Sequence, residues 1–417
     1  MNRSPLLIIF LTVFIDLIGF GIVMPVLPIY AERFGAGPVV VGLLLASFSF
    51  FQFLAAPILG RLSDRYGRRP VLFLSLLGTA AGFLLLGLAG SLWVLFMGRI
   101  IDGISGGNIS TAQAYIADVT TPENRARALG MVGAAFGLGF IIGPVIGGVL
   151  SAYGYAVPFL FAAGLALANA LLLYFRLPET VKAGGRARRG ETGWRLLGAT
   201  AADPGLRLVL VIYFMSSAAF AALTATLTLY TKHATEFRYD ATYNGYLFAF
   251  IGLVAAVVQG GLLGRLVKRC GESVLVAGGL LTLAASLVLL PFASTAGALL
   301  VAAGLVAVGN GLATPSLTAL ASRRTSAAHQ GSILGTTQSL NSLARVVGPV
   351  VGNILLEAAL RQAAGNTSQT ATAPGRALAA PFLVSAALAA ISFALALYYN
   401  AYWAQPAQAQ PELRPPA

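Results

Sequence analysis

The sequence has few charged residues. Asp, Glu, Lys and Arg make up only 10% of the 417 residues, whereas 57% are hydrophobic. Soluble domains carry about 25% charged residues, so this chain has too little polar surface to cover itself in water. In a bilayer the backbone must satisfy its own hydrogen bonds, and only helices and closed barrels do so. The composition therefore indicates a membrane protein of one of these two kinds.

Cysteine and histidine are also scarce, which excludes several kinds of site. Cys270 is the single cysteine, so no intramolecular disulfide can form, and the two histidines, His233 and His329, make no cluster with it. The sequence has no HExxH zinc motif, no nucleotide-binding loop and no GxSxG nucleophile motif. We therefore expect no bound metal, no cofactor and no enzymatic activity.

Long apolar runs are abundant. They are continuous over about 20 residues rather than alternating, which predicts membrane-spanning α-helices and not the strands of a barrel. The expected fold is an all-α polytopic membrane protein with twelve transmembrane helices. Their approximate bounds are 5–30, 39–60, 70–89, 92–117, 128–151, 157–175, 206–230, 241–264, 273–293, 296–321, 331–357 and 377–402.

The formal net charge of +13 follows the expected topology. If the N-terminus is cytoplasmic, twenty Lys and Arg fall in segments on the cytoplasmic side and five in loops on the opposite side. This bias places both termini in the cytoplasm of a cell (inner) membrane. The basic charge then matches anionic lipid headgroups and does not indicate nucleic-acid binding.

The longest polar stretch between apolar runs, 176–205, divides the chain into two sets of six helices. It is rich in Arg and Gly, as linkers are. The sequence therefore predicts an N-terminal six-helix bundle, a cytoplasmic linker, a C-terminal six-helix bundle and a cytoplasmic tail, at 1–175, 176–205, 206–403 and 404–417.

The two sets of helices share sequence motifs at nearly one offset. GRLSDRYG at 60–67 corresponds to GRLVKRCG at 264–271, and GFIIGPVIGGVL at 139–150 corresponds to ARVVGPVVGNIL at 344–355. Internal repeats around a site near the bilayer midplane are typical of secondary transporters. The pattern thus predicts two pseudo-repeats and a small-molecule substrate.

These motifs resemble the major facilitator superfamily, and within it the twelve-helix drug:proton antiporters nearest to the tetracycline-efflux family. Residues 60–69 are similar to the superfamily loop between helices 2 and 3. Asp16 resembles part of the helix-1 signature, and Arg99 part of the helix-4 motif. The antiporter motif of helix 5 is matched by Gly139, Gly143, Pro144, Gly147 and Gly148. The resemblance implies a monomeric transporter that works by alternating access and exchanges protons for amphipathic drugs or other small molecules.

The substrate stays open at this point. The tetracycline exporters carry further acids in helices 3 and 9 and a histidine in helix 8, and none is present near Gly82, in 277–283 or near Ala255. An alternative is a proton-coupled carrier of a sugar, a metabolite or an organic anion. Proton rather than sodium coupling rests on the family analogy.

The segment GRLSDRYGRRP at 60–70 places one acid, Asp64, among four arginines. Arginines alone would keep the segment in the cytoplasm, so the acid indicates a further role. A carboxylate is stabilised at a helix N-terminus by about 0.3–1 kcal/mol. The resemblance implies that Asp64 binds the start of helix 11, near residue 331, and so gates the cytoplasmic side. The remaining expected gate residues are Gly60, Arg65, Gly67, Arg68 and Asp118.

Four charged residues fall inside expected helices, where an ionised group costs at least a few kcal/mol. Asp16 lies about 17 Å into helix 1, and burial favours its protonated form. Arg99 and Asp102 share a helical face at i, i+3, as either a structural ion pair or a proton switch. Arg345 is expected to pair with an acid or to contact an anionic substrate. All four are candidates for proton coupling or substrate binding.

Amide side chains at membrane depth are also candidates, because lipid would leave their hydrogen bonds unmet. We expect them to line a polar cavity between the two sets of helices. They are Gln52, Asn108, Gln113, Gln259, Asn310, Gln338 and Asn341.

Overall fold

The structure of the chain is a computed structural model. It describes residues 3–106, 108–120, 122–180, 203–234, 237–325, 330–365 and 378–403. All regular secondary structure in these residues is helical, and eleven helices among them are long and apolar enough to cross a membrane. The expectation of an all-α polytopic fold is thereby confirmed.

Two sets of helices flank residues 181–202. The first set is α1 (Arg3–Glu32), α2 (Pro38–Tyr66), α3 (Arg68–Gly87), α4 (Leu92–Ser105), α5 (Asn108–Val119), α6 (Pro122–Ser151) and α7 (Val157–Arg176). The second set is α9 (Pro204–His233), α10 (Ala241–Val257), the π-helical turn η1 (Val258–Leu262), α11 (Leu263–Cys270), α12 (Glu272–Leu289), the 3-10 turn η2 (Leu290–Phe292), α13 (Ala296–Arg323), α14 (Gln330–Gly365) and α16 (Ala380–Trp403).

The expected span that is absent from these eleven is the fourth, 92–117, which is divided between α4 and α5. Gly106 ends α4, and its N–H donates to the carbonyl oxygen of Asp102 at 2.7 Å. Glycine costs about 1 kcal/mol inside a helix, and α2 packs closely against this position. A β-carbon at Gly106 would stand 3.0 Å from Nε2 of Gln52.

Two expected boundaries were wrong. The loop expected at 60–70 is mostly helix, because α2 continues to Tyr66 and only Gly67, at φ +106°, forms the turn to α3. Likewise α14 continues to Gly365, so Glu357 lies inside the helix and not at its end. In both cases the fall in hydrophobicity marks where the helix leaves the apolar layer, not where the helix ends.

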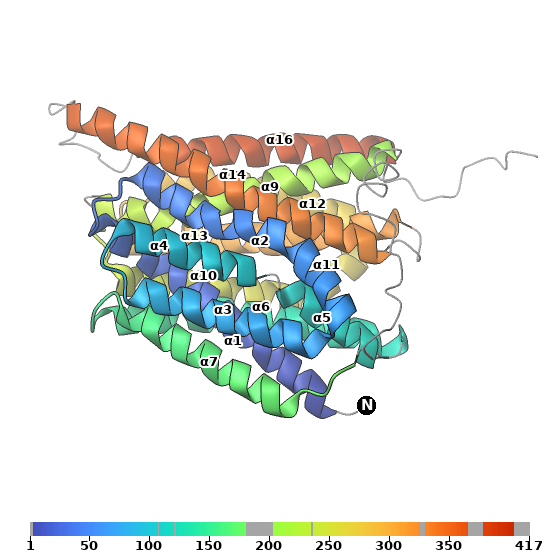
Figure 1. Cartoon of the computed structure of the whole chain (residues 1–417). Coiled ribbons are helices and arrows are strands. Elements are labelled where there is room, and N and C mark those ends of the chain that lie inside the picture. Colours follow the sequence, from blue (N-terminus) through green and yellow to red (C-terminus); the bar gives the residue numbers. More distant parts are fainter. Residues whose placement is uncertain are drawn as a thin grey trace, which may run out of the picture.

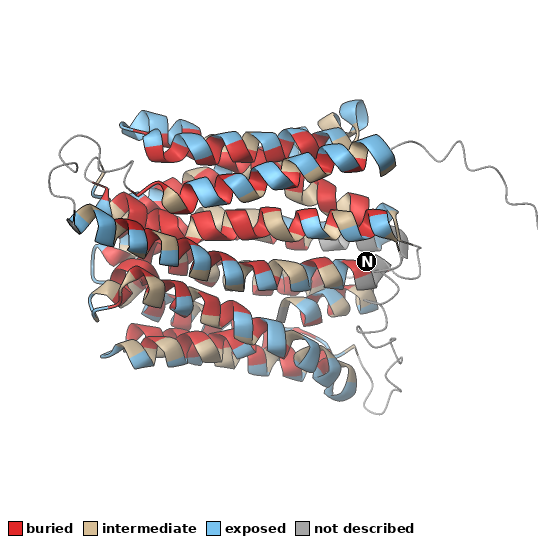
Figure 2. Ribbon diagram, turned by 90° about the horizontal axis from the view of Figure 1, so that it is seen from above, coloured by how far each residue is buried: buried red, intermediate tan, exposed pale blue. Residues whose placement is uncertain are grey.

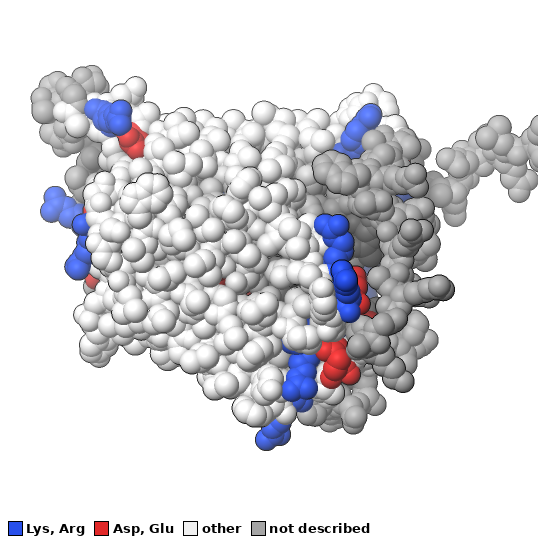
Figure 3. Space-filling view, viewed as in Figure 1, with Lys and Arg blue, Asp and Glu red and all other residues white. Residues whose placement is uncertain are grey.

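The long helices lie side by side, and their ends gather at two opposite ends of the bundle (Figure 1). Buried faces point into the bundle and exposed faces outward (Figure 2). On the face in Figure 3, nearly all the visible Lys, Arg, Asp and Glu lie near these two ends, with an almost uncharged band between them. We call the ends after Glu32, the last residue of α1, and after Asp64, near the end of α2.

Helix contacts follow the sequence repeat. Within the sets α1 packs on α6 and α9 on α14, and between the sets α2 packs on α14 and α6 on α10. Glycine permits the close crossings within the sets: a β-carbon at Gly143 would meet Gly21 at 2.8 Å, and one at Gly348 would meet Ala222 at 2.7 Å. The glycine–proline motifs therefore position α6 and α14 equivalently.

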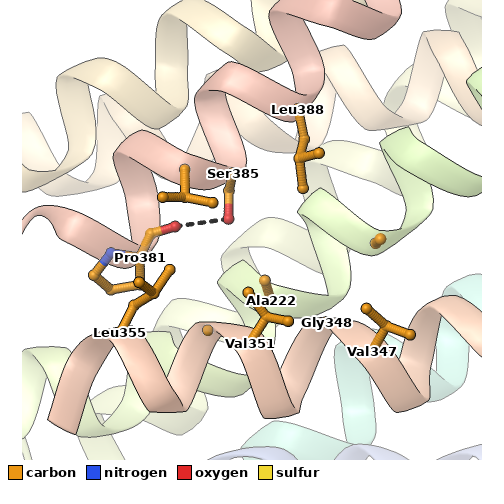
Figure 4. Close-up of a pocket in the computed structure, with 11 residues that line it drawn as sticks. Ala222, Val347, Gly348, Val351, Leu355, Pro381, Ser385 and Leu388 are labelled. Atoms are coloured by element: carbon orange, nitrogen blue, oxygen red, sulfur yellow. Dashed lines mark hydrogen bonds between the residues drawn. The ribbon is translucent and has the colours of Figure 1, made fainter. Parts of the chain in front are cut away.

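An apolar pocket lies between α9, α14 and α16 (Figure 4). Ser385 is the polar side chain in its lining, and its hydroxyl donates to the carbonyl oxygen of Pro381 at 2.8 Å. No charged side chain lines it, so this pocket is not the candidate site.

Candidate functional site

A second pocket lies in the middle of the bundle and contains ionisable groups. Asp16 of α1 and Asp102 of α4 line it, together with Arg345, which comes from α14 in the second set. The rest of the lining is Leu17, Phe20, Phe48, Gln52, Phe83, Gly106, Ile109 and Phe136. Three of the four charged residues expected at membrane depth thus meet in one pocket, which we call the central pocket.

A chain of hydrogen bonds joins Arg345 to the first set of helices. Nη2 of Arg345 donates to Oε1 of Gln52 at 3.0 Å, and Nε2 of Gln52 donates to the carbonyl oxygen of Gly106 at 2.7 Å. The break between α4 and α5 fixes the amide of Gln52, because that carbonyl lies at the break. One partner of Arg345 is thus an amide, which the sequence did not indicate.

Arg99 and Asp102 form a buried ion pair, of which Asp102 lines the central pocket and Arg99 does not. Nη1 of Arg99 lies 3.0 Å from Oδ2 of Asp102, with the two residues 2% and 5% exposed. The guanidinium group of Arg99 also lies over the ring of Phe48, 4.3 Å from its centroid. A buried charge needs such a partner, since an unpaired one is very unfavourable.

Five of the other amides expected at cavity depth have described side chains, and none of these lines the central pocket. Gln113, Gln259 and Gln338 are exposed, while Asn310 and Asn341 are half-buried. Asn310 accepts a hydrogen bond from Thr314 on its own helix at 3.0 Å. The side chain of Asn108 lies outside the described residues. Of the described amides, Gln52 alone contributes to this pocket's lining.

Arg68 organises the Asp64 end of the bundle. Its guanidinium group lies 2.5 Å from Asp64 and 3.1 Å from Asp118, and it donates to the hydroxyl of Ser63 at 2.6 Å. Arg65 instead lies over the ring of Tyr66 at 5.2 Å. A β-carbon at Gly60 would meet open space. The side chains that begin α14 lie outside the described residues, so the expected Asp64 contact there stays a prediction.

Glu179 is a residue of this region that sequence reasoning missed. Its two carboxylate oxygens accept hydrogen bonds from the backbone N–H groups of Arg68 and Arg69, each at 3.0 Å. A carboxylate at the first turn of α3 satisfies donors that the helix leaves unpaired. Gly67 leaves it room, since a β-carbon there would stand 2.5 Å from Glu179. No local pattern links residues more than a hundred positions apart.

The glycines of α6 face two neighbours. Positions 139, 143 and 147 lie against α1, where β-carbons would come within 2.6–3.0 Å of Leu17, Ile18 and Ile22. Gly148 lies against α10, with the carbonyl oxygen of Ala241 at 3.0 Å. The glycines of the antiporter motif therefore allow close packing of α6 against both sets of helices.

Polar contacts between the sets gather at the Glu32 end. Glu32 binds Lys232 and lies 2.7 Å from Nε2 of His233. Glu357 of α14 accepts a hydrogen bond at 3.0 Å from the backbone N–H of Val39, in the first turn of α2. Carboxylates at this end therefore join α1 to α9 and α2 to α14.

Comparison with known proteins identifies the class of protein. The family model of the Major Facilitator Superfamily matches residues 9–349, with a further match over 261–414. The chain therefore belongs to this superfamily of membrane transporters. Its transport role, and the expectation that it is not an enzyme, are confirmed by this membership.

Within the superfamily, the chain is similar to drug-resistance proteins. It is 35% identical to the class C tetracycline resistance protein of Escherichia coli, over 84% of this chain and 89% of that protein. It is 29% identical to multidrug resistance protein 2 of Bacillus subtilis, over 85% and 90%. The resemblance to antiporters of this group is thereby confirmed.

Solved structures share the fold. The human organic anion transporter MFSD10 (TETRAN) superposes with a TM-score of 0.68 at 28% identity, covering 94% of this chain and 99% of that chain. A bacterial homologue of the human lysosomal transporter Spinster, in an inward-facing and unoccupied conformation, superposes with a TM-score of 0.80 over 96% and 97%. Its identity of 14% supports the fold alone.

Proposed function

We propose that this chain exports amphipathic drugs or similar small molecules in exchange for protons. The observation that carries the proposal is the central pocket, where acids from the first set of helices meet Arg345 of the second set. Its drug-resistance relatives support the direction of transport. The transporter acts as a monomer in the cytoplasmic membrane, with both termini in the cytoplasm and two six-helix bundles joined by the segment 176–205.

The proposed mechanism is alternating access, and the present conformation fits the inward-facing state. The sets join closely at the Glu32 end, where a β-carbon at Gly42 would stand 2.6 Å from the carbonyl oxygen of Pro349. Towards the Asp64 end, β-carbons at Gly130 and Gly133 of α6 would meet open space, and Gln338 of α14 is exposed. With the Asp64 end cytoplasmic, substrate enters the central pocket from the cytoplasm.

Asp16 is the proposed proton carrier. It is half-buried and lines the central pocket. Asp102, which lines the same pocket, forms an ion pair with Arg99 at 3.0 Å. A proton and a basic group of a substrate both neutralise a carboxylate, so they compete for Asp16. Proton arrival from outside then releases the substrate outward, and the empty, protonated carrier returns.

Asp64 is proposed to close the opposite state. In the outward-facing conformation its carboxylate would lie at the N-terminus of α14, where a negative charge is stabilised. In the present conformation Arg68 holds Asp64 and Asp118 together. Glu179 fixes the backbone N–H of Arg68 at the same time.

A carrier of organic anions is the second candidate. Arg345 places a guanidinium group in the central pocket, and the structural relative MFSD10 is an organic anion transporter. In that case substrate and proton would bind together, because an anion beside Asp16 favours its protonated form.

Proteoliposomes with an imposed pH gradient distinguish the two. The test compounds are fluorescent lipophilic cations, tetracycline and aromatic carboxylates. We expect cations or tetracycline to accumulate on the acidic side, and Asp16→Asn to abolish this dependence on the gradient. Carboxylates moving in the same direction as the protons would establish the second candidate. The exposed variant Arg265→Gln is the matched control and should behave as wild type.

A further inference from the structure

The last turn of α9 carries two basic side chains that contact one acid of the other set of helices. Lys232 forms an ion pair with Oε2 of Glu32, the last residue of α1. Nε2 of His233 lies 2.7 Å from the other carboxylate oxygen, Oε1. The side chain of Glu32 is 15% exposed and that of His233 is 35% exposed. The carboxylate is thus largely enclosed, while the imidazole stays within reach of the medium.

This cluster holds the two sets of helices together at the Glu32 end. A second polar contact lies deeper between the same two helices, where the hydroxyl of Thr228 on α9 donates to the carbonyl oxygen of Met24 on α1 at 3.2 Å. In the proposed alternating access the Glu32 end opens, and α1 and α9 then move apart. Any change that strengthens the contact of Glu32 with α9 therefore favours the closed state of this end.

His233 is the member of the cluster that can change its charge near neutral pH. Histidine side chains titrate between about pH 5 and pH 8, whereas carboxylate and ammonium groups keep their charge there. A proton on the imidazole places a second positive charge 2.7 Å from the carboxylate of Glu32, and a charge-assisted hydrogen bond is stronger than a neutral one. Repulsion between Lys232 and His233 exists in both states, because both lie on α9. The attraction to Glu32 is what differs between the closed and the open state.

The other charged groups near this end do not replace Glu32. Among the described residues, Glu32 is the charged partner of His233 across the interface, and Lys232 is its charged neighbour on α9. The remaining described charged residues of the adjoining segments contact other groups or are exposed, and they are Arg33, Arg238, Asp240, Glu357 and Arg361.

We propose that Glu32 and His233 form a second proton-binding site, separate from Asp16, at the Glu32 end of the transporter. With this end outside the cell, a proton from the external medium strengthens the α1–α9 contact and favours the inward-facing conformation. The effect is present at acidic external pH and is lost as the pH rises. Acid outside thus favours return to the state that loads substrate from the cytoplasm. The inference rests on the proposed alternating access and membrane orientation.

Labelling of a cysteine placed inside the α1–α9 contact measures closure of the Glu32 end. Thr228→Cys, combined with Cys270→Ser, puts the thiol at a fully buried position and removes the exposed native thiol. A membrane-impermeant maleimide outside full-length transporter in liposomes then reacts when that end opens. The external pH is varied from about 5.5 to about 7.5 at fixed internal pH, in an Asp16→Asn background that removes the central carboxylate. Each rate is divided by that of the unfolded protein at the same pH, which corrects for ionisation of the thiol.

Acid outside should slow the labelling about two- to fivefold, the size expected for a partly exposed charge pair. His233→Gln should abolish this dependence on external pH. Lys232→Gln should keep it, because His233 and Glu32 remain. If His233→Gln fails to fold, His233→Lys decides the question, since its permanent charge should keep labelling slow at every pH. The matched control is His329→Gln, which removes the other histidine of the chain and should leave the pH dependence unchanged.

Three outcomes would overturn the inference. These are a labelling rate that does not depend on external pH, a dependence that persists in His233→Gln, or labelling from the inside only, which would place the Glu32 end in the cytoplasm. Gradient-driven accumulation of basic compounds, lost in Asp16→Asn, would leave the exporter proposal standing in the first two cases. Absence of gradient-driven transport for compounds of every charge would instead sink the exporter proposal, and pH-dependent closure lost in His233→Gln would still support this site.

Discussion

The two interfaces between the sets of helices share a backbone arrangement but differ in charge. At the α2–α14 interface, a β-carbon at Gly42 would stand 2.6 Å from the carbonyl oxygen of Pro349. At the α6–α10 interface, one at Gly245 would stand 2.5 Å from that of Pro144. The equivalent glycines and prolines are related by the sequence repeat, so one close-packed crossing is built twice.

The polar residues of the α2–α14 interface are not repeated at the α6–α10 interface. Three of their equivalents are apolar, and the fourth carries the opposite charge. Arg345 and Gln52 meet there, Glu357 holds the first turn of α2, and Asp64 lies near the far end of α2. The corresponding residues of α6, α10 and α11, at offsets of 203–205, are Phe140 for Arg345, Ala255 for Gln52, Ala152 for Glu357 and Lys268 for Asp64.

This difference suggests a division of roles: the residues that close the Glu32 end are repeated at both interfaces, whereas the charged residues proposed to couple transport to protons are not repeated. Glycine crossings pack both interfaces closely at the Glu32 end, and at the α2–α14 interface Glu357 adds a hydrogen bond to the N–H of Val39. In the proposed mechanism, Arg345, Glu357 and Asp64 act along the α2–α14 interface, whereas Asp16 and Asp102 reach the central pocket from α1 and α4. We propose that the α6–α10 interface acts as a seal, while the α2–α14 interface links the central pocket to both ends of the bundle.

The largest expected effect comes from the ion pair behind the α2–α14 interface. Removing one partner of a buried pair costs about 3–5 kcal/mol, so Asp102→Asn and Arg99→Gln should each strongly lower thermal stability in detergent. The double variant Arg99→Met/Asp102→Leu should regain much of the lost thermal stability, because it leaves no unpaired buried charge. The measure is the fraction of protein that stays monodisperse after heating, with Arg65→Gln as an exposed control. A stable Asp102→Asn whose transport no longer depends on pH would make the pair a proton switch instead.

The shared backbone arrangement predicts equal sensitivity of the two interfaces. Gly42→Val and Gly245→Val each place side-chain atoms against a carbonyl oxygen, and overpacking costs about 1–3 kcal/mol. Transport should fall by about tenfold in both variants. Gly164→Val, where a β-carbon meets open space, is the control. A loss confined to one variant would show that the two crossings are not equivalent.

The smallest effects concern the carboxylates at the two ends of the α2–α14 interface. A carboxylate at a helix N-terminus contributes about 0.3–1 kcal/mol. Glu357→Gln should therefore shift the equilibrium about two- to fivefold towards the outward-facing state, and Asp64→Asn should shift it towards the inward-facing state. Labelling of single cysteines from each side of the membrane measures the shift. Shifts in the same direction for both variants would contradict the opposed roles, and Lys268→Ala should cause none.

The sequence predicted the helical spans, the repeat and three charged residues of the central pocket, because composition and periodicity report these directly. It placed the end of α2 too early, since Gly60 and the arginines after it resemble a loop although they continue the helix. The Arg345–Gln52 contact depends on how the two sets dock. Glu179 follows α7, the last helix of the first set, and contacts the first turn of α3, which lies far from it in the sequence. Neither contact has a local pattern.

The most direct test of coupling is the count of protons released when substrate binds to purified transporter in weak buffer. Wild type and Asp16→Asn are compared with cations, tetracycline, sugars and organic anions. Proton release on adding a basic compound, lost in Asp16→Asn, is the predicted result. Demonstrable binding of a sugar or an organic anion, with no proton release from any compound, would contradict the account.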